Sequence, residues 1–419
     1  MSDLLARVTA LALAAKKASR ALALAPAAVR DQALRAAAAA LRADEAAILA
    51  ANAEDLALAR AKGLAEAMVD RLRLDPARLE AIAVACEDVA KLPDPVGEVT
   101  EDWTRPNGLR IVRRRVPIGL VAIIFESRPN VTVDAAALCL KSGNGCVLRG
   151  GSEALRTNLA LARAFGAGLR AAGLPAEGVT LLPFTDREAV PALGSLRGIV
   201  DIIVPRGGPG LIEAVVNSAK VPVIKHDAGI CHVYVHARAD LAKALPIIVN
   251  AKCQRPSACN AAETVLVDAA IAPTFLPGLA AALAAQRTEV RADARALALM
   301  PGARAATEAD FRTEHLALIL NVKVVADLAE AVDHIESCGS HHSDAILTED
   351  EAAARSFLAQ VDSACVYWNA STRFTDGGEF GFGAEVGIST DRLHARGPMG
   401  IRELTTWKFE ITGQGQVRS

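Results

Sequence analysis

The segment from Lys252 to Thr264 contains Cys259, the residue of this chain best suited to covalent chemistry. The segment leads from the end of an expected helix into the strand-like run Val265 to Val267, so the thiol lies at an element boundary where it could open onto a cleft. A cysteine thiolate is a nucleophile that forms thioesters and thiohemiacetals, which suggests acyl-level chemistry. A free cysteine is also commonly a small buried hydrophobic residue, and composition alone leaves that alternative open.

Cys253 is the main rival to Cys259, but it belongs to the helical run that begins at Leu241, where packing is its expected role. The eight cysteines form no CxxC pair and no export signal is expected, so the sequence predicts reduced thiols instead of disulfides. No group of histidines, cysteines and carboxylates has the spacing of a zinc site. His341 and His342 are adjacent, for example, and their side chains cannot converge on one ion, so no metal is implied.

A second candidate site follows the apolar run Val116 to Phe125, which we predict to be one buried strand. The run breaks into a polar turn that carries Arg128 and Asn130 and precedes a helix. Ligands of parallel sheets bind beyond the carboxyl ends of the strands. Asn130 could therefore donate its amide N–H to an oxyanion, and Arg128 could bind an acidic substrate. The alternative is that Asn130 only caps the following helix.

Two glycine-rich turns each close a predicted strand and open a helix. Their residues are Arg149, Gly150, Gly151, Arg206, Gly207 and Gly208. Glycines let the backbone approach a phosphate while the N–H groups of the helix N-terminus face it, and a nearby arginine suits a 2′-phosphate as well as a pyrophosphate. Such turns are also common for structural reasons, but two of them in one sheet domain favour nucleotide binding.

The elements that must position these residues alternate between short β-runs and helices. Before them, the first ninety or so residues have helical periodicity interrupted at Pro26, Gly63 and Pro76, which predicts four helices on one side of a larger body. One alternating series then includes a predicted strand at Val221 to Ile224, and a second series begins near Val233. This alternation predicts βαβ units and parallel, doubly wound sheets in two successive α/β domains.

The length and charge of the chain limit its architecture and partners. A chain of 419 residues is too long for one ordinary core, so two or three domains are expected. The formal net charge of -2 argues against nucleic acid, and the basic run Arg113 to Arg115 is expected to be a solvated strand face. No apolar stretch is long enough to span a bilayer, and Met1 to Arg20 has the pattern of an amphipathic helix instead of a signal peptide. We expect a cytoplasmic protein.

The same stretches together resemble the aldehyde dehydrogenase superfamily. The resemblance is carried by the run Pro117 to Asn130, the two glycine-rich turns, the Cys259 segment and the tail Trp368 to Gly381, and it extends from about Leu4 to Thr412. Within the superfamily, the chain is most similar to the branch that reduces γ-glutamyl phosphate. The stretches closest to the signatures of that branch are Glu126 to Thr132, Lys225 to Ile230 and Ala370 to Met399.

The resemblance implies NADPH-dependent reduction of L-glutamyl 5-phosphate to L-glutamate 5-semialdehyde and phosphate, in proline synthesis from glutamate. The Cys259 thiolate would attack the acyl phosphate, and hydride from the nicotinamide would reduce the resulting thioester. Asn130 and the backbone N–H of Cys259 would hold the oxyanion.

The resemblance also implies an aldehyde dehydrogenase-like α/β fold with a Rossmann-type cofactor domain, an α/β catalytic domain and a small β extension. The NADP-binding domain is expected over residues 1–95 and 116–228, and the catalytic domain over residues 229–393. Residues 96–115 and 394–419 are short, polar and extended. We expect them to pair as a small protruding sheet for oligomerisation into a homodimer or homotetramer.

Four further residues take roles from their positions in this resemblance. Glu314 is similar to the carboxylate that contacts the nicotinamide ribose. Arg149 stands where a lysine usually lies near the adenosine ribose, which favours NADP over NAD. Arg373, in a turn with Ser371, is the candidate partner for the substrate α-carboxylate, unless it only braces that loop.

Hydrolytic members of the superfamily activate water with a glutamate in a Glu-Leu-Gly-Gly stretch. Here the matching residues 225–229 are Lys-His-Asp-Ala-Gly, which fits an acyl group that comes from phosphate instead of water. An acid–base role for His226 or Asp227 and a purely structural one both remain open.

Two alternatives remain: a superfamily member that uses another acyl donor or a free aldehyde, and a catalytically silent nucleotide-binding protein. The presence of both Cys259 and Asn130 argues against the silent protein, because neither is needed to build a core. No kinase-like segment accompanies the site, so a separate glutamate 5-kinase is expected to supply the substrate and is a candidate partner.

Overall fold

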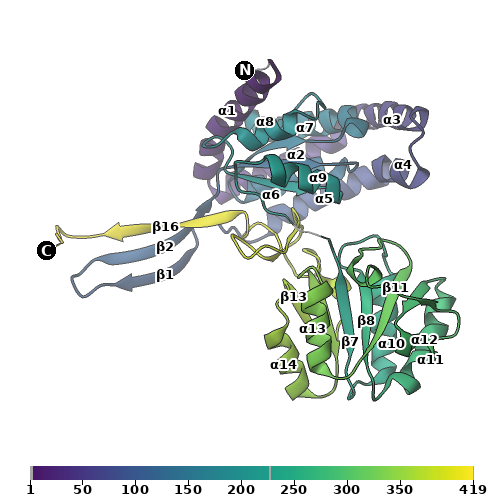
Figure 1. The fold of residues 1–419 in the computed structure, drawn as a ribbon. Helices are drawn as coiled ribbons and strands as arrows, with labels where there is room; N and C mark the ends of the chain where they lie inside the picture. The colour runs from purple at the N-terminus through teal and green to yellow at the C-terminus, as the bar shows by residue number, and fades with distance from the viewer. Residues whose placement is uncertain (1–2, 226–227, 419) are drawn as a thin grey trace. The chain divides into compact units, whose positions relative to one another are not determined.

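The computed structural model describes residues 3–225 and 228–418, which form two compact units (Figure 1). Unit 1 comprises Met1–Lys225, Gly381–Gly387 and Met399–Ser419, and unit 2 comprises His226–Phe380 and Ile388–Pro398. The predicted catalytic segment, residues 229–393, is thus interrupted by a short stretch that belongs to unit 1. No described helix is both long and apolar enough to cross a membrane.

Unit 1 begins with a layer of helices. They are α1 (Asp3–Leu24), α2 (Ala27–Ala43), α3 (Glu45–Ala61), α4 (Glu66–Leu72) and α5 (Pro76–Lys91). The prediction of four helices is wrong, because the chain also breaks at Asp44, between α2 and α3. Aspartate is a weak helix former that favours helix ends, but without an adjacent glycine or proline it gave too little signal to mark this boundary.

A four-stranded parallel sheet lies at the centre of unit 1, in the order β5-β4-β3-β6. Its strands are β3 (Leu120–Phe125), β4 (Gly145–Arg149), β5 (Val179–Leu181) and β6 (Ile202–Arg206). The helices that follow these strands are α6 (Asn130–Lys141), α7 (Leu155–Ala171), α8 (Ala189–Ser195) and α9 (Pro209–Ser218). All of β3 is buried, as expected for a strand covered on both faces. The carboxyl ends of β4, β3 and β6 therefore meet at one edge.

Two strand predictions in unit 1 are wrong. The run Val116 to Phe125 is two strands, because Gly119 has a φ of 129° and separates β3 from β2 (Arg110–Pro117) of another sheet. The run Val221 to Ile224 makes only an isolated bridge, Val223 to Ile203. Pro222 lies within that run, and proline cannot donate a ladder hydrogen bond.

An antiparallel sheet of three strands, β1-β2-β16, extends away from the helices of unit 1 (Figure 1). It consists of β1 (Val99–Thr104), β2 and β16 (Thr405–Thr412), and β16 pairs with β2 along its length. The arginines of β2 form ion pairs across the sheet: Arg113 with Glu101, and Arg114 with Glu410 at 2.8 Å. This basic run is thus neutralised by carboxylates of the same sheet.

Unit 2 contains a seven-stranded parallel sheet in the order β10-β9-β11-β8-β7-β12-β13. Its strands are β7 (Cys231–Val235), β8 (Ala262–Asp268), β9 (Glu289–Ala292), β10 (Arg304–Ala305), β11 (Ile319–Val325), β12 (Ser343–Leu347) and β13 (Cys365–Trp368). Its helices are α10 (Leu241–Cys253), α11 (Ala272–Ala285), α12 (Ala294–Leu297), α13 (Leu328–Cys338) and α14 (Glu351–Gln360). Because neighbouring strands run in the same direction, the amino ends of β11, β8, β7 and β12 lie side by side.

Candidate active site

The carboxyl edge of the unit 1 sheet brings three predicted site residues into one pocket. Arg128 and Asn130 follow β3, and Arg206 ends the adjacent strand β6, where it lies opposite Phe125. The pocket has a volume of about 50 Å³ and is also lined by Asp134. The structure thus groups residues that the sequence assigned separately to substrate, catalysis and cofactor.

Asn130 is the first residue of α6, and its amide Nδ2 donates to Asp134 Oδ2 at 2.7 Å. It is not the cap of that helix, because Pro129 occupies the N-cap position. Burial raises the pKa of Asp134 to about 6, although the hydrogen bond from Asn130 and the charge of Arg206 oppose this shift. Since an amide nitrogen carries two hydrogens, this bond fixes the Asn130 side chain and leaves its second N–H for another acceptor.

The turn after β4 is built from tight internal packing. A side chain at Gly150 would collide with Asn158, and one at Gly151 would collide with Glu153. Arg149 is 7% exposed and donates to the Thr185 carbonyl oxygen at 2.8 Å. Burial lowers the pKa of its guanidinium. Packing therefore explains Gly150, whereas Gly151 meets only the end of the Glu153 side chain, and Arg149 already has a partner within the protein.

The turn after β6 is more open. Gly208 caps α9, and an added side-chain atom at Gly208 or Gly210 would meet nothing within 4 Å. The Gly208 N–H donates to Glu126 Oε2 at 3.1 Å, and a side chain at Gly207 would come within 2.5 Å of the same oxygen. A carboxylate at this helix N-terminus shows that the turn accommodates an anion. These residues fit a nucleotide phosphate that replaces Glu126 there.

In unit 2, Cys259 lies in the loop between α10 and β8 and is half-buried. Gly229 packs directly against its backbone, because a side-chain atom at Gly229 would lie 2.6 Å from the Cys259 carbonyl carbon and 2.7 Å from its Cα. Any other residue at position 229 would displace the main chain of Cys259, the predicted nucleophile. His226 and Asp227, for which an acid–base role and a structural one were both left open, lie outside the described residues.

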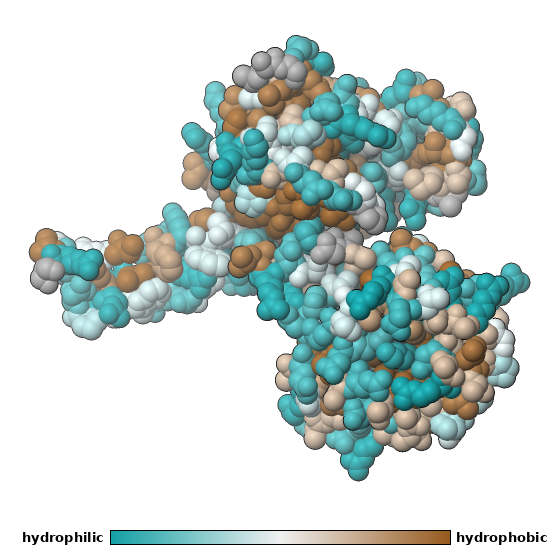
Figure 2. Space-filling model, viewed as in Figure 1, coloured by the Kyte–Doolittle hydropathy of each residue, from teal (hydrophilic) through white to brown (hydrophobic). Residues whose placement is uncertain are grey.

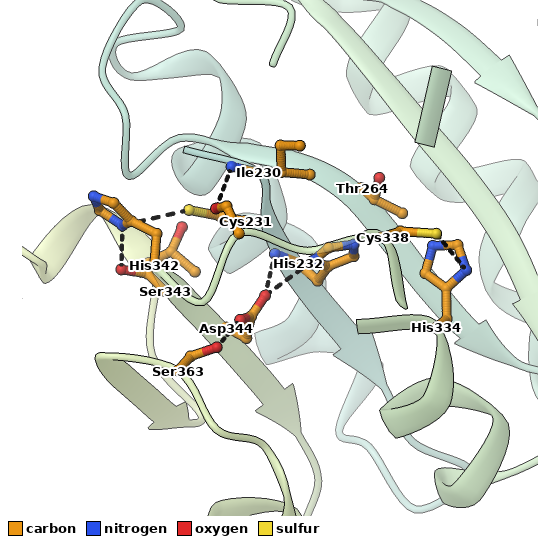
Figure 3. Close-up of polar contacts among 12 residues, drawn as sticks. Ile230, Cys231, His232, Thr264, His334, Cys338, His342, Ser343, Asp344 and Ser363 are labelled. Atoms are coloured by element: carbon orange, nitrogen blue, oxygen red, sulfur yellow. Dashed lines mark hydrogen bonds and ion pairs between the residues drawn. The ribbon is translucent and has the colours of Figure 1, made fainter. Parts of the chain in front are cut away.

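Cys231, at the start of β7, contacts both the Cys259 backbone and His342, which lies just before β12; Figure 3 shows Cys231 beside His342. Cys231 Sγ donates to the Cys259 carbonyl oxygen at 3.3 Å and lies 3.7 Å from His342 Nδ1. His342 Nδ1 is 2.8 Å from Ser343 Oγ, which lies 2.6 Å from Thr375 Oγ1. Burial holds the pKa of the Cys231 thiol well above its usual value, so Cys231 acts as a hydrogen-bond donor here and not as a second thiolate.

A second network in the same region ties β7 to β12 (Figure 3). The ring nitrogen Nδ1 of His232 lies 2.9 Å from Asp344 Oδ1, and both side chains are fully buried. Ser363 donates to Asp344 Oδ2 at 2.5 Å. Since buried polar groups are costly when unpaired, these bonds fix the register of the two strands that carry the support of Cys259.

Glu314 precedes β11 and reaches the same edge of the sheet. Its pKa is raised by burial, while a hydrogen bond from the backbone of Gly229 opposes the shift. Gly229 thus contacts both Glu314 and the backbone of Cys259. The structure brings the predicted ribose-binding carboxylate and the predicted nucleophile to one place in unit 2.

A fully buried ion pair lies near Glu314. Lys252 Nζ, at the end of α10, is 2.6 Å from Glu263 Oε2 at the start of β8, and both side chains are 0% exposed. Burial raises the pKa of Glu263 to about 7 in spite of Lys252. Glu263 also accepts from the Leu316 N–H at 3.3 Å, and Leu316 has a φ of 53°. The pair therefore holds the left-handed turn that follows Glu314.

Arg373 contacts Asn260, the residue after Cys259. Its Nη1 donates to Asn260 Oδ1, and its Nε donates to Gln254 Oε1 at 2.9 Å. Ser371 is buried and accepts from the Arg373 N–H at 3.3 Å, where the short helix η4 (Thr372–Phe374) begins. Arg373 thus braces the loop beside Cys259, and its contact with a substrate α-carboxylate stays a prediction.

The sequence analysis missed three features of the site: Asp134, the Lys252–Glu263 pair and the Cys231–His342 contact. Asp134 had a signal, since it is the single acidic residue of α6 and stands one helical turn after Asn130. Cys231 and His342 are 111 residues apart, and Lys252 and Glu263, 11 residues apart, belong to different elements, so no local pattern identifies these contacts.

Comparisons with known proteins bear on the family of this chain. The model of the aldehyde dehydrogenase family matches residues 5–301. The gamma-glutamyl phosphate reductase of Rhodospirillum rubrum is 55% identical over 96% of this chain and 95% of that protein. The enzyme of the same name from Methylobacterium sp. (strain 4-46) is 57% identical over 96% of this chain and 94% of that protein.

Solved structures give the same result. The gamma-glutamyl phosphate reductase of Thermotoga maritima matches with a TM-score of 0.97 and 46% identity, covering 98% of this chain and 100% of that one. An acetylating aldehyde dehydrogenase from Geobacillus thermoglucosidasius shares the fold at 19% identity, with a TM-score of 0.70 and full coverage of both chains. The predicted superfamily and fold class are confirmed. The chain belongs to the aldehyde dehydrogenase family and, within it, to the gamma-glutamyl phosphate reductases.

Proposed function

We propose that this protein catalyses the glutamate 5-semialdehyde dehydrogenase reaction in the direction of reduction. L-Glutamyl 5-phosphate and NADPH give L-glutamate 5-semialdehyde, phosphate and NADP, as a step of L-proline synthesis. The observation that carries the proposal is the identity of 53% to 57% with gamma-glutamyl phosphate reductases over at least 96% of the chain.

The covalent step belongs to Cys259. Its thiolate forms a bond to the acyl carbon while the bond from that carbon to the phosphate oxygen breaks, and phosphate leaves with the electron pair and takes a proton from solvent. The acyl group is then a thioester on the cysteine. Two N–H groups stabilise the oxyanion as it develops. One is the Asn130 side-chain N–H that is not bonded to Asp134, and the other is the backbone N–H of Cys259.

Members of the aldehyde dehydrogenase family use a nicotinamide cofactor, which supplies the hydride that reduces the thioester. We assign its phosphates to the Gly207–Gly208 turn and its nicotinamide ribose to Glu314. Gly150 and Gly151 shape the neighbouring turn, and Arg149 favours NADP through its positive charge near the adenosine ribose.

Release of aldehyde regenerates the Cys259 thiolate, because collapse of the reduced adduct breaks the carbon–sulfur bond. Water is not a reactant in this scheme. The stretch from Lys225 to Gly229 lacks the glutamate that activates water in hydrolytic relatives, which supports an acyl phosphate as the reacting partner.

We further propose a cytoplasmic homo-oligomer that forms through the β1-β2-β16 sheet, with a glutamate 5-kinase as the source of the substrate. Three side chains of β16 project from the same face of this sheet, and Trp407, Phe409 and Ile411 are 46%, 52% and 60% exposed. Figure 2 shows hydrophobic residues on this sheet among hydrophilic ones. An exposed apolar face on β16, an edge strand of this sheet, favours association with a second copy.

The experiment that tests the proposed reaction measures NADPH oxidation with L-glutamyl 5-phosphate formed in situ by a glutamate 5-kinase. We expect oxidation that requires the kinase, ATP and glutamate together, and that is faster with NADPH than with NADH. Turnover of a coenzyme A thioester at a comparable rate without the kinase would instead favour an enzyme that uses another acyl donor.

A further inference from the structure

The pocket at the carboxyl ends of β3 and β6 places two guanidinium groups beside Asn130. Arg128 lies in the turn after β3, and Arg206 ends β6 on the neighbouring strand, so both side chains line the same small volume. Arginine carries its N–H donors in a planar fork that matches the oxygen atoms of phosphate.

We propose that this pocket binds the phosphoryl group of the acyl phosphate, and inorganic phosphate in the reverse reaction, with Arg206 and Arg128 as its ligands. This inference rests on the proposed function and deepens it, because it separates the phosphoryl subsite from the cofactor site. It also assigns Arg206 to the substrate, whereas the sequence suggested a cofactor role.

The chemistry of the substrate limits which group can enter this pocket. The phosphoryl oxygen and the carbonyl oxygen are bonded to the same acyl carbon, so the phosphorus lies within a few ångströms of the oxygen that Asn130 stabilises. The α-carboxylate is separated from that carbon by the rest of the carbon chain. A cavity of about 50 Å³ that includes Asn130 therefore suits the phosphoryl group and not the α-carboxylate.

Arg206 supplies the N–H donors that the pocket can use to bind an anion. Among the residues that the structure describes, its guanidinium has no hydrogen-bond or ion-pair partner, and its interaction is the longer-range attraction of Asp134. Asp134 is itself occupied, since it accepts from the Asn130 amide. Glu385 lines the pocket too, so the two carboxylates balance the two guanidinium charges before a phosphate binds.

Gly387, in the stretch Gly381–Gly387 that belongs to unit 1, packs closely against Arg206. A side-chain atom added to Gly387 would lie 3.4 Å from Arg206 Nη1 and 3.6 Å from its Cδ. The glycine therefore lets the chain pass against the Arg206 side chain without pushing the guanidinium away from Asn130.

The test uses the reverse reaction, phosphate-dependent reduction of NADP by glutamate semialdehyde, with inorganic phosphate as the probe. For Arg206→Gln we expect the KM for phosphate to rise at least about tenfold, which corresponds to about 1.4 kcal/mol. The KM for NADP should stay within about twofold, because the cofactor phosphates lie at Gly208. Arg206→Lys should recover part of the loss, and Arg128→Gln should raise the same constant.

Arg197→Gln is the matched control, since Arg197 is an exposed arginine of unit 1 that does not line the pocket. It should leave every constant unchanged. A rise in the KM for NADP with an unchanged KM for phosphate would return Arg206 to the cofactor and overturn the proposal. An unchanged KM for both would overturn it as well.

A binding measurement covers the case in which Arg206→Gln is inactive. Inorganic phosphate should raise the melting temperature of the wild-type protein and have a clearly smaller effect on this variant, and an equal increase in both would refute the subsite. A wild-type protein that reduces NADP without any need for phosphate would refute the proposed function itself. Phosphate-dependent activity with an unchanged KM for phosphate in the Arg206 and Arg128 variants would refute the phosphoryl subsite. The proposed function would then stand.

Discussion

At the scale of single residues, Cys259 is held through its main chain. Cys231 donates to its carbonyl oxygen, Gly229 packs against its backbone, and Arg373 and Thr372 bond to Asn260, the next residue. A predicted nucleophile fixed in this way would keep its position while its sulfur forms and breaks bonds, which is the preorganisation that covalent catalysis needs.

The buried pair of Lys252 and Glu263 supports this arrangement and can be tested by a double-mutant cycle. Lys252→Met leaves the Glu263 carboxylate without its partner in a site that is 0% exposed, so we expect a loss of about 3–5 kcal/mol of stability. The double variant Lys252→Met with Glu263→Leu removes both charges and should recover most of that loss. Denaturant unfolding measures the free energy of unfolding of each variant. A loss in the double variant that equals the sum of the losses in the two single variants would contradict coupling between these residues.

His334 gives the protein an acid-sensitive contact. Burial, together with His232, Lys323 and Arg312, lowers its pKa from 6.5 to about 3, and Lys323 Nζ lies 3.1 Å from its Nδ1. The folded state therefore keeps His334 neutral at pH values where the unfolded chain binds a proton. The stability that depends on neutral His334 is fully present above about pH 6.5 and is lost as the pH falls toward 3.

We expect His334→Gln to flatten this dependence. Between about pH 6.5 and pH 4 the wild-type protein should lose up to about 3 kcal/mol more stability than the variant. Melting temperatures across this range measure the difference, and His394→Gln, at an exposed position, is the control. Parallel curves for the wild type and His334→Gln would show that His334 does not titrate in this way.

The positions of two site residues in the fold were predictable, because the neighbouring sequence carried the signal. Cys259 and Asn130 stand at the ends of clear elements, and the sequence placed both at the edges of parallel sheets. Asp134 was missed although it lies one turn from Asn130, because a single acid in a helix usually faces solvent. Lys252 and Glu263 are both fully buried, and only the folded chain shows that their charges meet.

At the scale of elements, the segment before β7 and the loop before β8 must pass each other at close range. Gly229→Ala would place a carbon atom 2.6 Å from the Cys259 carbonyl carbon, so the two segments have to separate. We expect a loss of activity of about a hundredfold, because a nucleophile displaced by about 1 Å loses its geometry. Steady-state kinetics with the kinase-coupled assay measures the effect.

Gly278→Ala is the matched control for this substitution. Gly278 lies inside α11, where an added carbon atom meets nothing within 4 Å, and alanine favours a helix by up to about 1 kcal/mol over glycine. This variant should keep full activity and gain slightly in stability. Equal activity of Gly229→Ala and Gly278→Ala would contradict the importance of the close approach.

The elements themselves were largely predictable, because buried parallel strands are short apolar runs and the helices between them are periodic. The failures have local causes. Asp44 ends one helix and begins the next without a strong breaker, Gly119 turns the chain from one sheet into another, and Pro222 prevents a predicted strand. Strand order could not be predicted, since it depends on contacts between distant segments.

At the scale of the whole molecule, the proposed surface for association is the β1-β2-β16 sheet. We expect Phe409→Lys combined with Ile411→Thr to weaken the assembly, because the change places charge and polarity on the exposed apolar face. Light scattering coupled to gel filtration should show a smaller species. Leu24→Ser, at an apolar residue that is 85% exposed on α1, is the control. An unchanged mass for the sheet variant would exclude this face as the contact.

In the proposed reaction, Cys259 takes the acyl group from phosphate and holds it as a thioester, which hydride from the nicotinamide then reduces. The most direct measurement follows NADPH formation from glutamate semialdehyde and NADP, with and without inorganic phosphate, for the wild type, Cys259→Ala and Cys253→Ala. Cys253 is the control because it is a half-buried thiol at the end of α10 that contacts Thr288.

We predict that the wild type and Cys253→Ala form NADPH only with phosphate, and that Cys259→Ala is slower by at least about a thousandfold. NADPH formation that continues in Cys259→Ala, or that needs no phosphate in the wild type, would contradict the account.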